Sequence, residues 1–215
     1  MKCLGIILAG GTSTRMSLPP GHSKADLTLG GHSLLEHVCR AVRPEVDRLA
    51  VVVGPDQAMP RLPEIDSLVR DSRPGAGPLA GVADALRAAG SDIDRAFVTS
   101  CDVPLLSPAV VRLVLDRLAP SDALWAVPLI DTHLQVLASA MRPAILPAIE
   151  TFLASGRRDL HGLAEELAGV GMLATISQSD VERVDPSCLS FADADTPEEL
   201  ATLEAILPRL PMSRR

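Results

Sequence analysis

The chain has 215 residues, of which 47% are hydrophobic and 22% are charged, and its formal net charge is −7. This size and composition predict a soluble protein that folds as one domain, residues 1–215, around a substantial core. The acidic balance argues against nucleic acid or an anionic membrane surface as a partner, since both call for a positively charged footprint. An aromatic content of 2% also argues against a surface on which single-stranded bases stack.

Signals for targeting, membrane insertion and disulfide formation are absent from the sequence. The apolar run 4–9 is too short for the hydrophobic region of a secretory signal, and no segment approaches the ~20 apolar residues of a membrane helix. We therefore expect a cytoplasmic protein. The four scattered cysteines form no zinc motif and are expected to be small buried residues: Cys3, Cys39, Cys101 and Cys188.

Strand-like and helix-like patterns alternate along the chain. The predicted strands are 3–8, 49–53, 67–70, 95–100, 123–128, 133–139, 172–176 and 188–192. The predicted helices are 33–42, 78–89, 107–118, 142–154, 159–168 and 197–206. Ser107 and Thr196, each followed by a proline, are clear start signals for two of these helices. The alternation predicts an α/β fold in three layers, a Rossmann-like and mostly parallel sheet between helices, with right-handed crossovers.

The first predicted strand runs directly into paired glycines, in the segment Leu8-Ala9-Gly10-Gly11. Residues without a Cβ let backbone amides approach a ligand closely, and the positive charges of Arg15 and Lys24 that follow suit a polyphosphate. The segment lacks the Gly-Lys-Ser/Thr ending of a Walker loop and the third glycine of the dinucleotide fingerprint. By itself it is equally typical of an ordinary tight turn.

Two later segments point to the same kind of ligand. Asp71 opens a second glycine-rich loop, which ends in Gly77-Pro78-Leu79-Ala80-Gly81 and leads into a predicted helix. The predicted strand 95–100 is followed by Cys101-Asp102, so a carboxylate lies at the carboxyl end of a strand, where ligands of parallel sheets bind. Such a carboxylate suits Mg²⁺, which usually takes one or two protein carboxylates and completes its shell with water and substrate phosphates.

Together these segments resemble the molybdenum cofactor guanylyltransferase family, which belongs to the wider group of nucleotide-sugar-type nucleotidyltransferases. The resemblance covers nearly the whole chain, in order. It rests on Leu8-Ala9-Gly10-Gly11 with Arg15-Met16 and Lys24, on Asp71 with Gly77-Pro78-Leu79-Ala80-Gly81, on Cys101-Asp102-Val103-Pro104, and on Phe191 with Asp195-Thr196-Pro197-Glu198-Glu199-Leu200. The first motif is shared across the wider group, whereas Gly-Pro-Leu-Ala-Gly after an aspartate is more particular to the guanylyl branch.

The resemblance implies a fold of the nucleotide-diphospho-sugar transferase type and transfer of GMP from GTP to molybdenum-bound molybdopterin. It also implies transient contact with proteins that deliver molybdopterin or accept the product. Carried over by position, Lys24 would contact the phosphates, Asp71 the nucleotide, and Asp102 both the nucleotide and Mg²⁺. The residues that would line the nucleotide are Leu8, Ala9 and Gly10.

A reaction can be written for these residues as a hypothesis. The amides of Gly10 and Gly11 would hold the β- and γ-phosphates, Arg15 and Lys24 would neutralise the departing pyrophosphate, and Mg²⁺ on Asp102 would polarise the α-phosphorus. A terminal phosphate of the acceptor would then attack in line. Because that phosphate is already anionic near neutral pH, positioning and charge stabilisation would carry the catalysis without a strong general base.

Some positions depart from the family pattern and keep alternatives open. Gly54 stands where the family commonly has asparagine, which removes a side-chain amide from the nucleoside pocket. Asp195 stands where the family often has asparagine, as in the related cytidylyltransferases of molybdopterin; it could face the metal or serve as an acidic N-cap. The alternatives are therefore a nucleotidyltransferase with CTP or another acceptor, and a catalytically silent nucleotide-binding module. Gly11, where the cytidylyl branch usually has alanine, favours GTP, and retention of Lys24 and Asp102 disfavours the silent module.

Overall fold

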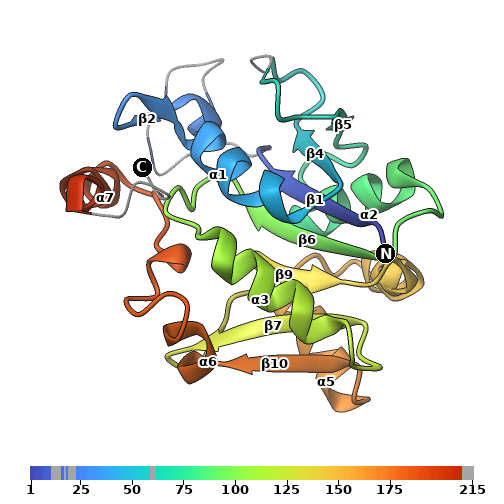
Figure 1. Ribbon diagram of the computed structural model, residues 1–215. Coiled ribbons are helices and arrows are strands. Elements are labelled where there is room, and N and C mark those ends of the chain that lie inside the picture. Colours follow the sequence, from blue (N-terminus) through green and yellow to red (C-terminus); the bar gives the residue numbers. More distant parts are fainter. Residues whose placement is uncertain (11–15, 17, 19–22, 59–61, 210–215) are drawn as a thin grey trace.

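The structure, a computed structural model, describes the chain apart from residues 11–15, 17, 19–22, 59–61 and 210–215. Its centre is a sheet with strands in the order β10-β7-β9-β6-β1-β4-β5, and β8 pairs with β7 (Figure 1). The strands are β1 (Cys3–Leu8), β4 (Arg48–Val53), β5 (Ser67–Arg70), β6 (Arg95–Ser100), β7 (Trp125–Ile130), β8 (His133–Leu134), β9 (Ala138–Met141) and β10 (Leu173–Ser177). Strand β9 runs antiparallel to β6 and β7, and β8 antiparallel to β7, whereas the other pairings are parallel.

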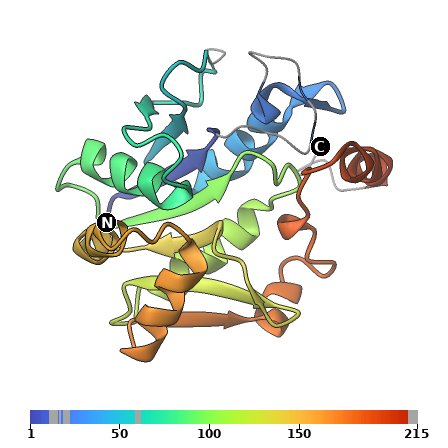
Figure 2. The ribbon, with the colours of Figure 1, turned by 180° about the vertical axis from the view of Figure 1, so that it is seen from behind.

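Helices cover both faces of this sheet, as the two opposite views in Figures 1 and 2 show. The α-helices are α1 (Leu34–Val42), α2 (Pro78–Ala89), α3 (Pro108–Leu118), α4 (Leu146–Ala154), α5 (Leu160–Gly169), α6 (Gln178–Glu182) and α7 (Pro197–Ile206). Short 3₁₀ helices are η2 (Lys24–Asp26), η3 (Arg43–Glu45), η4 (Pro143–Ile145), η5 (Leu189–Phe191) and η6 (Leu207–Arg209). The predicted three-layer α/β fold is therefore confirmed.

Side-chain alternation along the strands builds a separate core on each face of the sheet. In β1, Cys3 and Ile7 join the core beneath α1 and α3, whereas Leu4 and Ile6 join the core beneath α2, α4 and α5. Because all four are buried, a run with no polar residue is what a central strand covered on both faces requires.

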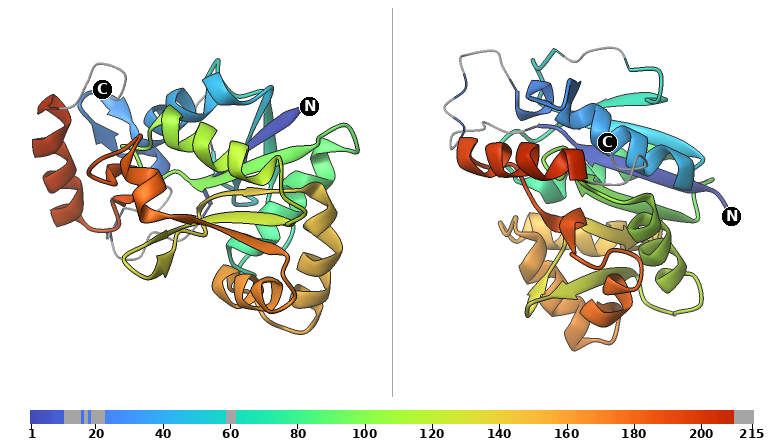
Figure 3. Two further views of the ribbon diagram at one scale, coloured as in Figure 1. Left: turned by 60° about the horizontal axis from the view of Figure 1, so that its bottom comes forward. Right: turned by 60° about the vertical axis from the view of Figure 1, so that its left-hand side comes forward.

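The C-terminal part packs at one end of the sheet. Helix α7 lies beside the hairpin of β2 (Thr28–Leu29) and β3 (His32–Ser33), and Figure 3 shows this group set apart from the layers. A third apolar cluster joins the two, formed by Leu29, Leu34, Leu105, Ala194, Leu203 and Leu207. The segment that precedes α7 is thereby held near the carboxyl ends of β1 and β6.

Most predicted elements are observed, with five differences. The predicted strand 188–192 is wrong: this segment forms η5, after Cys188 in the left-handed region at φ 49°. The predicted strand 133–139 is two strands, β8 and β9, and the predicted helix 142–154 is η4 followed by α4. The β2–β3 hairpin and α6 were not predicted. Ser107 and Thr196 cap α3 and α7 as expected. In the described part of the chain, no helix is both long and apolar enough to cross a membrane.

Candidate active site

The carboxyl ends of three neighbouring parallel strands, β6, β1 and β4, form one edge of the sheet. The residue after β1 and the residue after β6 each add one more backbone hydrogen bond to the neighbouring strand. Ala9 N–H donates to the Val52 carbonyl at 2.8 Å, and Cys101 N–H donates to the Leu8 carbonyl at 3.0 Å. Asp71, which follows β5, likewise donates its N–H to the Val53 carbonyl at 2.9 Å. The predicted segments after β1, β5 and β6 therefore meet at one edge.

A cavity of about 800 Å³ opens at this edge, beside the ends of β1 and β4. Its lining residues are Leu8, Gly10, Ser23, Val52, Val53, Gly54, Pro55, Asp56, Gln57, Ala58, Asp71, Pro74, Gly75, Gly77, Pro78 and Gly81. At two of these positions close approach of neighbouring atoms favours glycine. A Cβ on Gly10 would lie 3.2 Å from the Gly54 nitrogen, and a Cβ on Gly81 would lie 3.1 Å from Val52 Cγ1. Gly81, the one glycine of α2, thus lets this helix pack closely on β4.

One ammonium and two carboxylates gather beside the cavity. Lys24 Nζ lies 3.5 Å from Asp102 Oδ2 and forms a hydrogen-bonded ion pair with Asp195 Oδ1. All three side chains are largely buried, between 14% and 22% exposed. Lys24 follows Ser23, which lines the cavity, so this cluster adjoins the cavity wall.

The electrostatics of the cluster favour a cation between its carboxylates. Burial lowers the pKa of the Lys24 ammonium, but the hydrogen bond to Asp195 and the negative charges of Asp102 and Asp195 outweigh burial and leave that pKa above its ordinary value. Burial also raises the pKa of Asp193, and the neighbouring charge of Asp195 raises it further. Among the described residues, one lysine thus faces two carboxylates here.

Local hydrogen bonds fix Lys24 and connect it to the cavity. Ser23 caps η2 in a capping box with Asp26, so the backbone at Lys24 is held from both sides. The amide of Gln57 donates to Ser23 Oγ and to the Ala9 carbonyl, each at 2.9 Å, and accepts from Gly54 N–H at 3.2 Å. Gln57 thus joins three segments of the cavity wall.

Hydrogen bonds hold Asp102 in place and link its segment to the segment of Asp195. Ser100 Oγ donates a hydrogen bond to Asp102 Oδ1, and Ala194 N–H donates to the Asp102 carbonyl at 2.8 Å. The N-cap of α7 is Thr196, whose hydroxyl accepts from Glu199 N–H, so the alternative of Asp195 as an acidic N-cap is wrong. The carboxylate of Asp195 points instead to Lys24.

The structure brings together most of the site residues expected from the sequence. Leu8, Gly10 and Asp71 line the cavity, and Ala9 is buried with its carbonyl bonded to Gln57. Lys24 and Asp102 pair beside it. Two expected residues, Gly11 and Arg15, lie outside the described residues.

Sequence reasoning missed Gln57 and Ser23. Gln57 lies in a loop without any motif, and its amide stands near the Gly54 backbone where the family asparagine would have been. The sequence offered one signal. Gly54 lacks the side-chain amide that the family commonly has at this position, so another residue could supply an amide there.

Comparison with known proteins places the chain in a family. The family model of the MobA-like NTP transferase domain matches residues 5–170. The chain belongs to the MobA-like NTP transferase family. Membership makes it a nucleotidyltransferase and confirms the family resemblance of the sequence.

Two curated relatives illustrate the similarity. A protein of Carboxydothermus hydrogenoformans named "Probable molybdenum cofactor guanylyltransferase" is 35% identical over 148 residues, which are 68% of this chain and 69% of that protein. A protein of Mycobacterium avium with the same name is 34% identical over 169 residues, which are 77% of this chain and 82% of that protein.

Solved structures show the same fold. Molybdopterin-guanine dinucleotide biosynthesis protein A from Archaeoglobus fulgidus aligns with a TM-score of 0.76 at 20% identity, over 97% of this chain and 100% of that chain. The 2-C-methyl-D-erythritol 4-phosphate cytidylyltransferase of Thermus thermophilus aligns with a TM-score of 0.70 at 20% identity, over 95% of this chain and 98% of that chain. The fold is that of the nucleotide-diphospho-sugar transferases.

Proposed function

We propose that this MobA-like NTP transferase moves GMP from GTP to molybdenum-bound molybdopterin and releases pyrophosphate. The observation that carries the proposal is the convergence of Lys24, Asp102 and Asp195 beside the glycine-lined cavity. The names of the curated relatives support the choice of substrates, and so do the Gly-Pro-Leu-Ala-Gly motif and Gly11. The proposal keeps the expectation of a single nucleotidyltransferase domain over residues 1–215 that acts in the cytoplasm.

In this proposal each residue has a role that follows from its place. The cavity between Gly10 and Asp71 takes the nucleotide, with Leu8 in its lining and the buried Ala9 between Leu8 and Gly10. Lys24 carries positive charge to the phosphates and stabilises the charge that develops on the leaving pyrophosphate. We assign the same task to Arg15 and phosphate contacts to the Gly11 amide, as expected from the sequence. An anionic phosphate of the acceptor attacks, so the protein's contribution is orientation and charge stabilisation.

The residues present fit Mg²⁺. Two carboxylates, Asp102 and Asp195, lie on either side of one positive charge, and oxygen donors are the ligands that Mg²⁺ prefers. Among the described residues, no group of three His, Cys, Asp or Glu side chains is placed to hold a metal ion, so a metal held here would complete its shell with phosphates and water. Asp102 would hold the ion, with Asp195 as a second oxygen donor. When bound, the ion would neutralise phosphate charge and polarise the α-phosphorus.

The base and the acceptor are tested by identifying the product. The protein is incubated with Mg²⁺, molybdenum-bound molybdopterin and, in turn, GTP, CTP, ATP or UTP, and the dinucleotide is identified by chromatography and mass spectrometry. The guanine dinucleotide with GTP alone is expected. Exclusive use of CTP would contradict the guanylyl assignment and favour the cytidylyl alternative that Asp195 suggests. Binding of triphosphate without product from any of the four would favour the catalytically silent module.

A further inference from the structure

The loop between β5 and α2 has one face on the cavity and one face on the helices behind it. Its cavity face consists of Asp71, Pro74, Gly75 and Gly77. The two intervening side chains, Ser72 and Arg73, bond instead to α2 and α4. The position of the cavity face therefore depends on what holds the other face.

Ser72 is held by a buried carboxylate on α2. Asp84, 8% exposed, accepts a hydrogen bond from Ser72 N–H at 2.7 Å through Oδ2 and from Ser72 Oγ at 2.9 Å through Oδ1. A carboxylate buried in the middle of a helix is unfavourable unless it is hydrogen-bonded and paired. Ser72 supplies the hydrogen bonds, and Arg87, three residues further along α2, supplies the charge.

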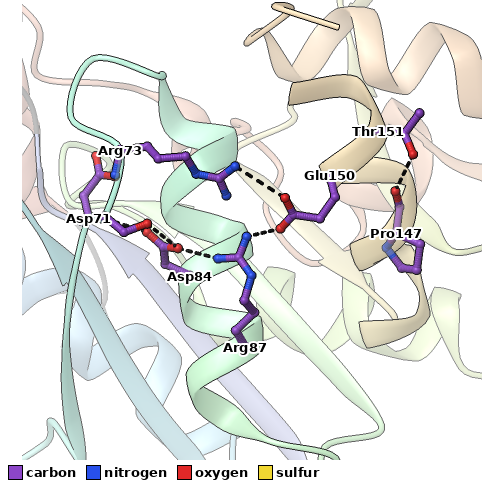
Figure 4. Close-up of polar contacts among 8 residues, drawn as sticks. Asp71, Arg73, Asp84, Arg87, Pro147, Glu150 and Thr151 are labelled. Atoms are coloured by element: carbon purple, nitrogen blue, oxygen red, sulfur yellow. Dashed lines mark hydrogen bonds and ion pairs between the residues drawn. The ribbon is translucent and has the colours of Figure 1, made fainter. Parts of the chain in front are cut away.

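The pairing continues to α4 and closes a ring (Figure 4). Arg87 bonds both Asp84 and Oε1 of Glu150 on α4, and Oε2 of Glu150 accepts from Arg73 Nη1 at 3.4 Å. Arg73 adjoins Ser72, so the chain itself completes the ring. The ring contains two arginines and two carboxylates, so its charges sum to zero and it needs no charged ligand for balance.

Asp71 is attached directly to this ring. Its Oδ1 accepts a hydrogen bond from Arg73 N–H at 2.9 Å, so the backbone of Arg73 orients the carboxylate that lines the cavity. Arg73 Nη2 is buried and has no hydrogen-bond partner in the described part of the chain, which leaves Glu150 as the ion partner of this side chain. Loss of the Glu150 charge would therefore leave a partly buried cation unpaired.

A second contact, from the turn that follows α4, supports the same loop. Arg158 Nη1 donates to the Gly75 carbonyl at 3.0 Å, and a Cβ on Gly77 would lie 3.0 Å from the Arg158 carbonyl oxygen. Residues 150 and 158 are far from the loop in sequence, yet both contact it. Helix α4 and the turn after it thus back the cavity from behind.

We infer that Glu150 is a positioning residue for nucleotide binding: through Arg73 and Arg87 it sets the place of Asp71 on the cavity wall. The inference rests on the proposed function, in which Asp71 contacts the nucleotide. Glu150 does not line the cavity. Its effect should therefore appear in nucleotide affinity and KM and leave kcat unchanged.

The test compares Glu150→Gln with Glu165→Gln. The second variant makes the same chemical change at an exposed position of α5, and no hydrogen bond or ion pair involves Glu165 within the described chain. Calorimetry measures the Kd of each variant for GTP and CTP, steady-state kinetics measures KM and kcat, and denaturant unfolding measures stability. Glu150→Gln is expected to raise Kd and KM about threefold to tenfold, with kcat within about twofold of wild type. Glu165→Gln should match wild type.

A double-mutant cycle separates positioning from a general loss of structure. If Glu150 acts through Asp71, the effect of Glu150→Gln on Kd should largely disappear in an Asp71→Ala background. A lower stability with unchanged Kd would overturn the inference, and so would an equal effect in both backgrounds. Wild-type binding without product contradicts only the proposed function, whereas absence of binding by wild type to any triphosphate contradicts both.

Discussion

Two groups of charged side chains adjoin segments that line the cavity, and the balance of their described charges differs. Around Asp84, two arginines face two carboxylates and every charge has an opposite partner. Around Lys24, the described residues place one ammonium between two carboxylates, with Asp193 nearby. From this difference we propose that the first group shapes the cavity wall and that the second acts on the substrate.

The largest effect is expected from the unbalanced group. Asp102→Asn and Lys24→Ala should each lower kcat by about 10²–10³-fold, because Lys24→Ala removes positive charge that acts on the phosphates and Asp102→Asn removes the carboxylate proposed to hold Mg²⁺. Pyrophosphate release under saturating GTP measures the rate. Asp122→Asn, an exposed position between α3 and β7, is the matched control and should leave the rate unchanged. Near-normal rates for both site variants would refute the assignment of this group to catalysis.

Asp195→Asn tests whether Asp195 binds Mg²⁺ or serves only to hold Lys24. If Asp195 is a second oxygen donor to Mg²⁺, the Mg²⁺ concentration for half-maximal activity should rise by about tenfold, while Lys24 keeps its pairing with Asp102. A titration of activity with MgCl₂ measures this shift. A lower kcat at an unchanged Mg²⁺ requirement would mean that Asp195 serves only to hold Lys24.

A smaller effect is expected at Gln57, which joins the two sides of the cavity. Gln57→Ala removes hydrogen bonds to Ala9 and Ser23, and should raise the KM for GTP about threefold to tenfold by loosening the segment that carries Lys24. Gln178, which is half-buried on α6 and does not line the cavity, provides Gln178→Ala as a control. Equal KM values for the two variants would show that Gln57 does not shape the site.

The smallest effect belongs to a polar contact in the scaffold. Burial lowers the pKa of His37, although its contact with the Leu29 carbonyl at 2.8 Å opposes the shift. A histidine with a folded pKa below its ordinary 6.5 favours the folded state at pH above 6.5, and that stability is lost as the pH falls from 6.5 through the folded pKa. Denaturant unfolding from about pH 8 to about pH 5 should therefore show a steeper loss for wild type than for His37→Gln. The same slope in both proteins would exclude this contribution.

The sequence predicted the site better where a motif sits at the end of a central strand. Gly10 and Asp102 follow β1 and β6, whose apolar runs have unmistakable boundaries, so their meeting at one edge follows from parallel pairing alone. The roles of Gln57 and Glu150 could not be predicted, because no local pattern marks these residues. Their contacts depend on tertiary packing between positions 34 and 77 residues apart in the chain. The wrong strand at 188–192 has the same origin: its apolar residues pack against other segments as a 3₁₀ turn.

The family match ends at residue 170, but the structure carries the chain onward until Ala194 docks on the backbone of Asp102 and Asp195 reaches Lys24. A carboxylate beside the proposed reaction centre is thus contributed from outside the matched region. Boundaries drawn by homology alone would separate that carboxylate from its lysine, so a fragment made to those limits would carry an altered charge environment around Lys24.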